Sequence, residues 1–142
     1  MLTSIIEASE NFCIHQIRVA HSIINELPDK RTLIAYIDIE TLDESKNHRV
    51  YLGAERAFAQ RVSTLFLEED DSDDETLIDM MLETANLIVG SAKVIAEESG
   101  KNTFTIQTPH FEKIDTFDME YDQMKVVKIE NDEMIIAIKE LN

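Results

Sequence analysis

The sequence of 142 residues contains one cysteine, two prolines, three glycines and no tryptophan. Cys13 therefore cannot form a disulfide within the chain, and we expect it to pack in the core because its neighbours are apolar at helical spacing. No set of cysteines and histidines has the spacing of a zinc site. A chain of this kind is typical of a reducing cytoplasm.

Basic residues are also scarce: 13 Lys and Arg stand against 29 Asp and Glu, which gives a formal charge of −16. We expect neither nucleic acid nor a membrane surface as a partner, because both are bound through clusters of Lys and Arg. No run of eighteen apolar residues is present, so no segment is expected to span a bilayer. The first fifteen residues contain acidic groups and no basic cluster, which argues against a secretory signal.

A large share of the negative charge is local, because residues 68–75 hold seven carboxylates in eight positions. Such density predicts a solvated loop. A calcium-binding loop is the alternative, but it requires a glycine at its sixth position and a glutamate at its twelfth. Counting from Asp70 or Asp71, the glycine is missing and the twelfth residue is Met81 or Leu82.

Apolar spacing predicts three helices. The first spans residues 4–27, begins with a capping box of Ser4 and Glu7, and stops at Pro28. The second spans residues 55–67 and is expected to direct four side chains inward: Phe58, Val62, Leu65 and Phe66. The third spans residues 75–99, with Asp73 or Asp74 as its N-cap and Gly100 as its C-terminal stop.

Alternation predicts strands between and after these helices. Residues 32–40 and 49–52 form two strands around a polar turn at 43–47. Strands at 103–107, 124–130 and 133–141 follow the third helix, with a looser segment at 110–122 and a hairpin turn at Asn131-Asp132. The order predicts an α+β fold in two layers, with long helices packed on an antiparallel-rich sheet and residues 1–142 in one domain.

The helix at 75–99 is apolar around most of its circumference, so we expect it to be central. A narrow strip at steps of three and four residues is polar or lacks a side chain, and its members align on one face. They are Asp79, Glu83, Asn86, Gly90, Lys93 and Glu97.

The pair Glu83 and Asn86 carries little information alone, since the chain has a second Glu-x-x-Asn at Glu44 and Asn47. Context distinguishes the first copy. Asn86 and Gly90 both weaken a helix, and local rules tend to be broken at functional sites. Gly90 either lets another surface approach the helix or packs tightly on the protein's own sheet.

Asp79, Glu83 and Asn86, followed after 22 residues by Pro109, resemble the signature of the CheC/CheX/FliY phosphatases. The surrounding segment 82–93 also resembles the family's helix, although Leu82 stands where members often have Gly. The second copy lacks this context, because Asp70 occupies the position of the proline. One copy in a short chain is most similar to the CheX type.

The resemblance implies hydrolysis of the aspartyl phosphate of a CheY-like response regulator in chemotaxis signalling. Asn86 would orient the attacking water and Glu83 would pair with a receiver lysine, with Asp79 and Gly90 in the docking contact and Pro109 as a structural residue. The chain would need no cofactor or metal of its own, since the receiver supplies Mg²⁺. The resemblance also implies a homodimer joined through C-terminal strands. The alternative is a non-catalytic receiver-binding or flagellar-switch module on the same fold.

Overall fold

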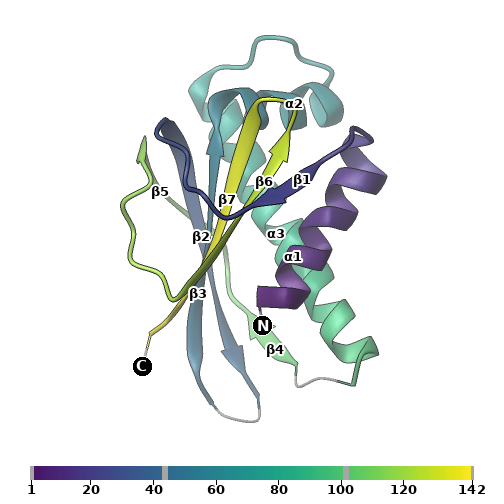
Figure 1. Ribbon diagram of the computed structural model, residues 1–142, viewed down its shortest axis with the longest axis vertical. Coiled ribbons are helices and arrows are strands. Elements are labelled where there is room, and N and C mark those ends of the chain that lie inside the picture. The colour runs from purple at the N-terminus through teal and green to yellow at the C-terminus, as the bar shows by residue number, and fades with distance from the viewer. Residues whose placement is uncertain (1, 43–44, 101–102, 142) are drawn as a thin grey trace.

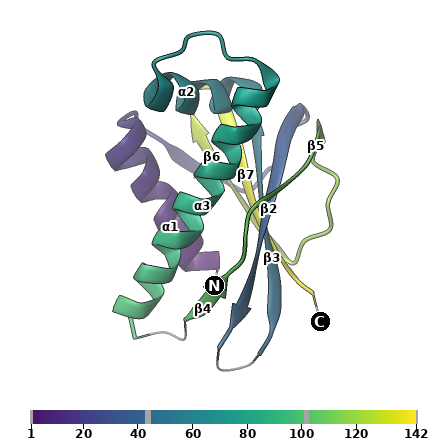
Figure 2. The ribbon, with the colours of Figure 1, turned by 180° about the vertical axis from the view of Figure 1, so that it is seen from behind.

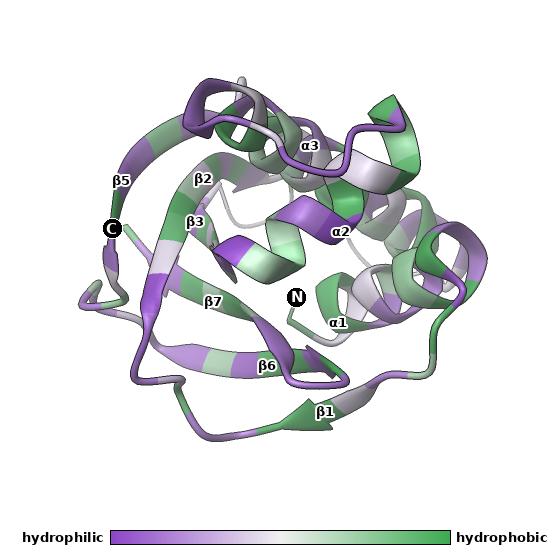
Figure 3. Cartoon of the chain, turned by 90° about the horizontal axis from the view of Figure 1, so that it is seen from above, coloured by the Kyte–Doolittle hydropathy of each residue, from purple (hydrophilic) through white to green (hydrophobic). Residues whose placement is uncertain are grey.

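A computed structural model describes residues 2–42, 45–100 and 103–141 and shows helices packed on one face of an antiparallel sheet (Figure 1). The seven strands follow the order β1-β6-β7-β3-β2-β4, and β5 also pairs with β2. Seen from above, the sheet curves around the helices (Figure 3). The predicted α+β fold in two layers is confirmed.

The long central strands pair β2 with β3 and β3 with β7. Their apolar side chains alternate, so that Leu33, Ile37 and Ile39 of β2 are buried in the core beneath the helices. The strands are β1 (Ser22–Ile24), β2 (Arg31–Thr41), β3 (Asn47–Glu55), β4 (Phe104–Ile106), β5 (His110–Thr116), β6 (Gln123–Ile129) and β7 (Asp132–Glu140). The predicted turn at 43–47 falls partly outside the described residues.

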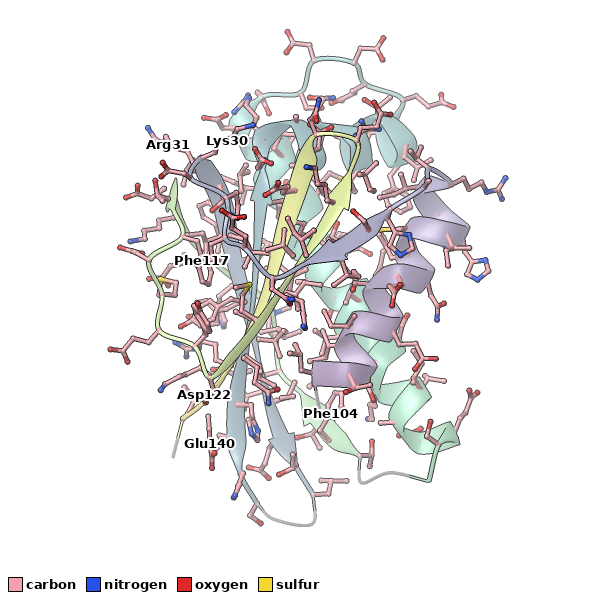
Figure 4. All side chains as sticks on the ribbon, in the orientation of Figure 1. Lys30, Arg31, Phe104, Phe117, Asp122 and Glu140 are labelled. Carbon is pink, nitrogen blue, oxygen red and sulfur yellow. The ribbon has the colours of Figure 1, made fainter. Side chains whose placement is uncertain are left out.

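A second, smaller apolar cluster covers the other face of the sheet. Phe117 lies there, on the side away from the helices, whereas Phe104 belongs to the core beneath them (Figure 4). At the lower end of this face the backbone N–H of Glu140 donates to the Asp122 carboxylate at 2.7 Å. This bond and the Lys139 ammonium hold the pKa of Asp122 below its usual range.

The helices are α1 (Leu2–Asn11), α2 (Arg56–Leu67) and α3 (Asp74–Glu98), and a π-helix, η1 (Phe12–Ile17), continues α1. α3 is predicted almost to the residue. The Asp73 side chain caps it by accepting from the Thr76 N–H at 2.9 Å, which lowers the pKa of Asp73. Gly100 has φ +69°, the left-handed conformation expected of a helix stop.

The prediction for the first helix is wrong in both its start and its length. The helix begins at Leu2, so Ser4 lies inside it and is buried instead of capping it with Glu7. The chain leaves the helical path at Arg18, which has φ 62°. Residues 22–24 form β1 because their backbone pairs with β6, and the β-branched Ile23 and Ile24 suit a strand. Tertiary pairing overrides helical spacing here.

Smaller corrections concern α2 and the C-terminal hairpin. Leu65 and Phe66 are 42% and 39% exposed, because α2 ends at the edge of the core. The hairpin turn is Glu130-Asn131, one residue earlier than predicted, since Asp132 already pairs with Ile129. β7 lies inside the sheet with β3 and β6 on its two edges, so among the C-terminal strands only β6 has an unpaired edge, beyond its pairing with β1.

Cys13 is fully buried, as predicted. Burial and the nearby Glu10 carboxylate raise the pKa of its thiol to about 12. A thiol with such a pKa is inert at neutral pH, which fits a core residue.

Candidate functional site

α3 presents one side to the core and the other to solvent (Figure 2). Its buried side includes Leu77, Met81 and Ile88, which contact the sheet and α1 through the main core. Asp79, Glu83 and Asn86 are exposed on the opposite side. The core contacts fix the backbone, so the polar side chains project from a rigid support.

The exposed side of α3 is wider than the predicted strip. Leu87 is 39% exposed and Val94 is 51% exposed, whereas the sequence pattern placed both among the buried residues. Both lie near residues of the strip. Leu87 directly follows Asn86 in sequence, and Val94 lies about one helical turn after Gly90. The outer face of α3 therefore combines carboxylates and an amide with apolar side chains, as a protein-binding surface does.

Gly90 is not needed for packing within the chain. A Cβ atom built there meets nothing within 4 Å, apart from the helix's own neighbouring backbone. The interpretation that Gly90 packs tightly on the sheet is therefore wrong. Its missing side chain leaves the helix backbone open to an approaching surface one turn beyond Asn86.

We expect Gly90→Ala to raise the free energy of unfolding by about 0.5–1 kcal/mol, because alanine favours a helix and the site has room for it. Urea denaturation measures this change. Gly53→Ala is the matched control: its Cβ would come within 3.2 Å of the Phe117 ring, so we expect destabilisation. A loss of stability in Gly90→Ala would contradict the open environment of this residue.

A groove of about 460 Å³ runs beside the strip, between α3 and the chain that joins β4 to β5. Its walls are Asn86 and Gly90 on the helix and Ile106, Gln107, Thr108 and Pro109 on the other side. The structure thus brings Pro109 next to Asn86, although 22 residues separate them in sequence. Gln107 and Thr108 are site residues that sequence reasoning missed, and their position directly before Pro109 was the available signal.

Pro109 lies where the edge strand departs from β2. Ile39 of β2 pairs with Ile106 of β4, and Tyr36 of β2 pairs with His110 of β5. The distance between these two pairs is three residues along β2 but four along the edge strand. The extra residue makes a bulge, and proline suits it because a proline has no N–H to donate to β2. Gln107 still donates to the Asp38 carbonyl oxygen at 2.9 Å, so the departure begins after it. The bulge turns this segment toward Asn86.

A smaller groove of about 190 Å³ borders the other side of the exposed face. Leu87 and Ser91 of α3 line it together with Phe12 and His15 of η1. His15 is exposed, and the imidazole Nε2 of His21 contacts the Glu10 carboxylate at 2.9 Å.

The side chains of Asp79, Glu83 and Asn86 make no hydrogen bond or ion pair in the described part of the chain. The described part of the chain also contains no cluster of three or more His, Cys, Asp or Glu side chains that could hold a metal ion. Asn86 is neutral and cannot act as a strong base. The arrangement can therefore orient a water or a partner group by hydrogen bonds, and it can offer a carboxylate to a cation.

In the second Glu-x-x-Asn, Asn47 begins β3, where it pairs with Glu40, so it does not project from a helix as Asn86 does. Glu44 lies outside the described residues.

The model of the family described as "Chemotaxis phosphatase CheX" matches residues 39–132, which include the strip, both groove walls beside Asn86, and Pro109. The chain belongs to the CheX family. No curated protein sequence matches it significantly. In this CheX family member the matched range leaves out residues 1–38, with α1, η1 and β1, and residues 133–142, with most of β7.

Solved structures share the fold at low sequence identity. CheX from Vibrio vulnificus is similar with a TM-score of 0.77 and 16% identity, over 99% of this chain and 98% of that one. The CheX–CheY–BeF3–Mg²⁺ complex from Borrelia burgdorferi is similar with a TM-score of 0.66 and 15% identity, over 97% of each chain. The FliM middle domain from Vibrio alginolyticus is similar with a TM-score of 0.56 and 6% identity, over 98% of this chain and 92% of that one.

None of the helices in the described ranges is long and apolar enough to cross a membrane.

Proposed function

We propose that this CheX-family chain is a phosphatase that hydrolyses the aspartyl phosphate of a CheY-like receiver domain in the cytoplasm. Asn86 orients the attacking water, and Glu83 pairs with a lysine of the receiver. Asp79 and Gly90 lie in the docking contact, and Pro109 shapes the groove wall. The receiver supplies the Mg²⁺, so this chain contributes no cofactor.

One observation carries the proposal: Glu83 and Asn86 project from a rigid, core-packed helix and are engaged with nothing else in the described residues. They are about 4.5 Å apart along the helix axis, which lets both reach one partner site. A helix held in this way keeps the amide in place when it enters the partner. The open backbone at Gly90 lets that partner come close.

The chemistry fits residues that position rather than react. Phosphoryl transfer needs an attacking water in line with the leaving oxygen and charge stabilisation around the phosphoryl group. The receiver's metal ion and lysine provide the charge stabilisation. An amide that donates and accepts hydrogen bonds can fix the water, and such positioning can account for a large part of a rate enhancement.

The test is the decay of a phosphorylated CheY-like receiver with and without the wild-type protein, followed by loss of labelled phosphate. We expect the protein to accelerate the decay catalytically, at a concentration well below that of the receiver. Binding to the phosphorylated receiver with no acceleration would instead support the second candidate, a non-catalytic interaction module.

That second candidate is supported by the shared fold of the FliM middle domain. A pure interaction surface needs neither a free amide nor a free carboxylate at these positions. The presence of both on the outer face of α3 favours the phosphatase.

A homodimer remains a prediction. Since β7 is paired on both edges, a second copy would have to add at an edge strand such as β1 or β5, or at residues 123–125 of β6 beyond β1. Light scattering at micromolar concentration should then give about twice the 16.3 kDa of one chain. A species of 16.3 kDa throughout would contradict it.

A further inference from the structure

A groove of about 470 Å³ opens between α2 and η1, on elements separate from the strip of α3. Its apolar lining consists of Ile17 and Val19 on one side and Ala57 and Leu65 on the other. Figure 1 places α2, the turn between β6 and β7, and the C-terminal end of the α1–η1 helix at this one end of the molecule. The groove is therefore a surface feature that receiver docking through Asn86 does not use.

Exposed apolar side chains lie on the two elements that border this groove, and one of them, Leu65, lines it. Leu65, Phe66 and Leu67 at the end of α2 are 42%, 39% and 44% exposed, and Ile14 of η1 is 52% exposed. Phe66 is held against the core by the Phe12 ring, with a centroid distance of 6.2 Å. A concentration of exposed apolar residues at one place marks a surface that binds another molecule.

The acidic loop is fastened along the edge of this groove. Gln60 and Thr64 line the groove, and both donate to the Glu69 carbonyl oxygen, at 3.0 and 2.8 Å. Gln60 also accepts from the Ser72 N–H at 2.9 Å, and Ser72 is only 3% exposed. These bonds hold the backbone of the acidic loop, at Glu69 and Ser72, against groove-lining residues of α2.

The acidic loop, Glu130 and Asp132 give the α2 side of the groove a negative charge, whereas Arg18 lies between Ile17 and Val19 on the η1 side. Arg61 in the groove wall is already paired with Asp132 at 2.6 Å and with Glu130 at 3.3 Å. The C-terminal end of α2 has no basic residue in its last turn and therefore adds the negative end of its dipole. An apolar groove bordered in this way is complementary to a helix with an apolar face and basic flanks.

We infer that the α2–η1 groove and the adjoining acidic loop form a docking site for a basic amphipathic helix of another protein. A second copy of this chain fits poorly, because a symmetric contact would bring two acidic loops together in a molecule of formal charge −16. An anionic membrane is repelled for the same reason. The site acts as an attachment point that is independent of the phosphatase strip.

The test uses a synthetic, fluorescently labelled helix of about 18 residues, with leucines on one face and lysines on the other. Its binding to the full chain is measured by fluorescence anisotropy at about 150 mM salt, which screens distant charges. We expect a dissociation constant on the order of micromolar, and a loss of about tenfold or more in Leu65→Asp. Val94→Asp is the matched control, because Val94 is also exposed, at 51%, but lies on α3.

Leu65→Asp separates the groove from general charge attraction. It adds one negative charge, so a peptide held by charge alone would bind it at least as tightly, and that result would overturn the proposal. A triple variant tests the loop. Glu68→Gln, Asp70→Asn and Asp71→Asn together should weaken peptide binding about threefold or more. The same change in net charge at Glu112, Asp115 and Glu120 should have a smaller effect.

Two further outcomes would also overturn the inference. One is the absence of peptide binding to the wild-type chain. The other is a wild-type dimer, seen by sedimentation, that Leu65→Asp converts to monomer, because a second copy would then be the occupant. Urea denaturation of each variant confirms that a loss of binding does not come from unfolding, since exposed substitutions change stability by about 0.5 kcal/mol.

Discussion

Asn86→Ala is expected to slow the accelerated decay of a phosphorylated receiver by about 100-fold or more while leaving receiver binding nearly unchanged. Removal of one positioned hydrogen-bonding group from a site of charge development has an effect of this size in other enzymes. The Asn86 side chain is exposed and unengaged in the described structure, so its loss removes no contact that stabilises the fold. The expected change therefore lies in kcat.

The measurement combines steady-state phosphatase kinetics with binding to a receiver loaded with beryllofluoride, which imitates the phosphoryl group. Asn86→Gln provides a finer probe, because it keeps the amide but moves it by one methylene; we expect it to retain little of the acceleration. Asn131→Ala, in the exposed turn between β6 and β7, is the matched control and should behave as wild type. Undiminished activity in Asn86→Ala would remove Asn86 from the proposed mechanism.

Glu83→Ala has the second largest expected effect and differs in kind, because it should impair both binding and acceleration. We expect KM for the phosphorylated receiver to rise about tenfold and kcat to fall as well. The carboxylate would form a charge-assisted bond to a lysine that becomes shielded from water when the two proteins dock. Loss of this bond weakens the complex and leaves the register of docking less well defined.

Salt and charge reversal separate this role from a general effect of charge. KM of the wild type should rise with ionic strength, and KM of Glu83→Ala should rise less. Glu83→Lys should bind the receiver more weakly than Glu83→Ala. In a binding assay, a receiver whose active-site lysine is changed to glutamate should partly restore the affinity of Glu83→Lys. Glu75→Ala, an exposed glutamate in the first turn of α3, is the control. An equal loss in Glu75→Ala would show that only net charge matters.

These two predictions rest on residues that the sequence already singled out, whereas their surroundings came from the structure. The 3.6-residue period of α3 is local, so the alignment of Glu83 with Asn86 and the cap at Asp73 could be read directly from the order of residues. The alternation along β2 was predictable for the same reason. Regular spacing in one element does not depend on what packs against it.

Where another element decides the outcome, sequence patterns were insufficient. Ile23 and Ile24 continue the apolar spacing of the first helix, but they form β1 because β6 offers an edge to pair with. Leu65, Leu87 and Val94 are apolar and were expected inside, yet they are exposed. Leu65 lies where α2 reaches the edge of the core, and Leu87 and Val94 lie on the side of α3 that faces away from it. Burial depends on neighbours distant in sequence, and one chain does not reveal them.

The sequence by itself determined the class of fold and the capped central helix, because both follow from local spacing and composition. The pair of side chains proposed for the chemistry came from the resemblance to the CheC/CheX/FliY phosphatases, which the spacing along the helix supports. Only the tertiary structure decided what surrounds that pair: the bulge that brings Gln107, Thr108 and Pro109 beside Asn86, and the open space at Gly90. It also decided that the acidic loop is fastened to α2 beside an apolar groove. These features arise from contacts between residues far apart in the chain, and packing of the whole molecule fixes such contacts.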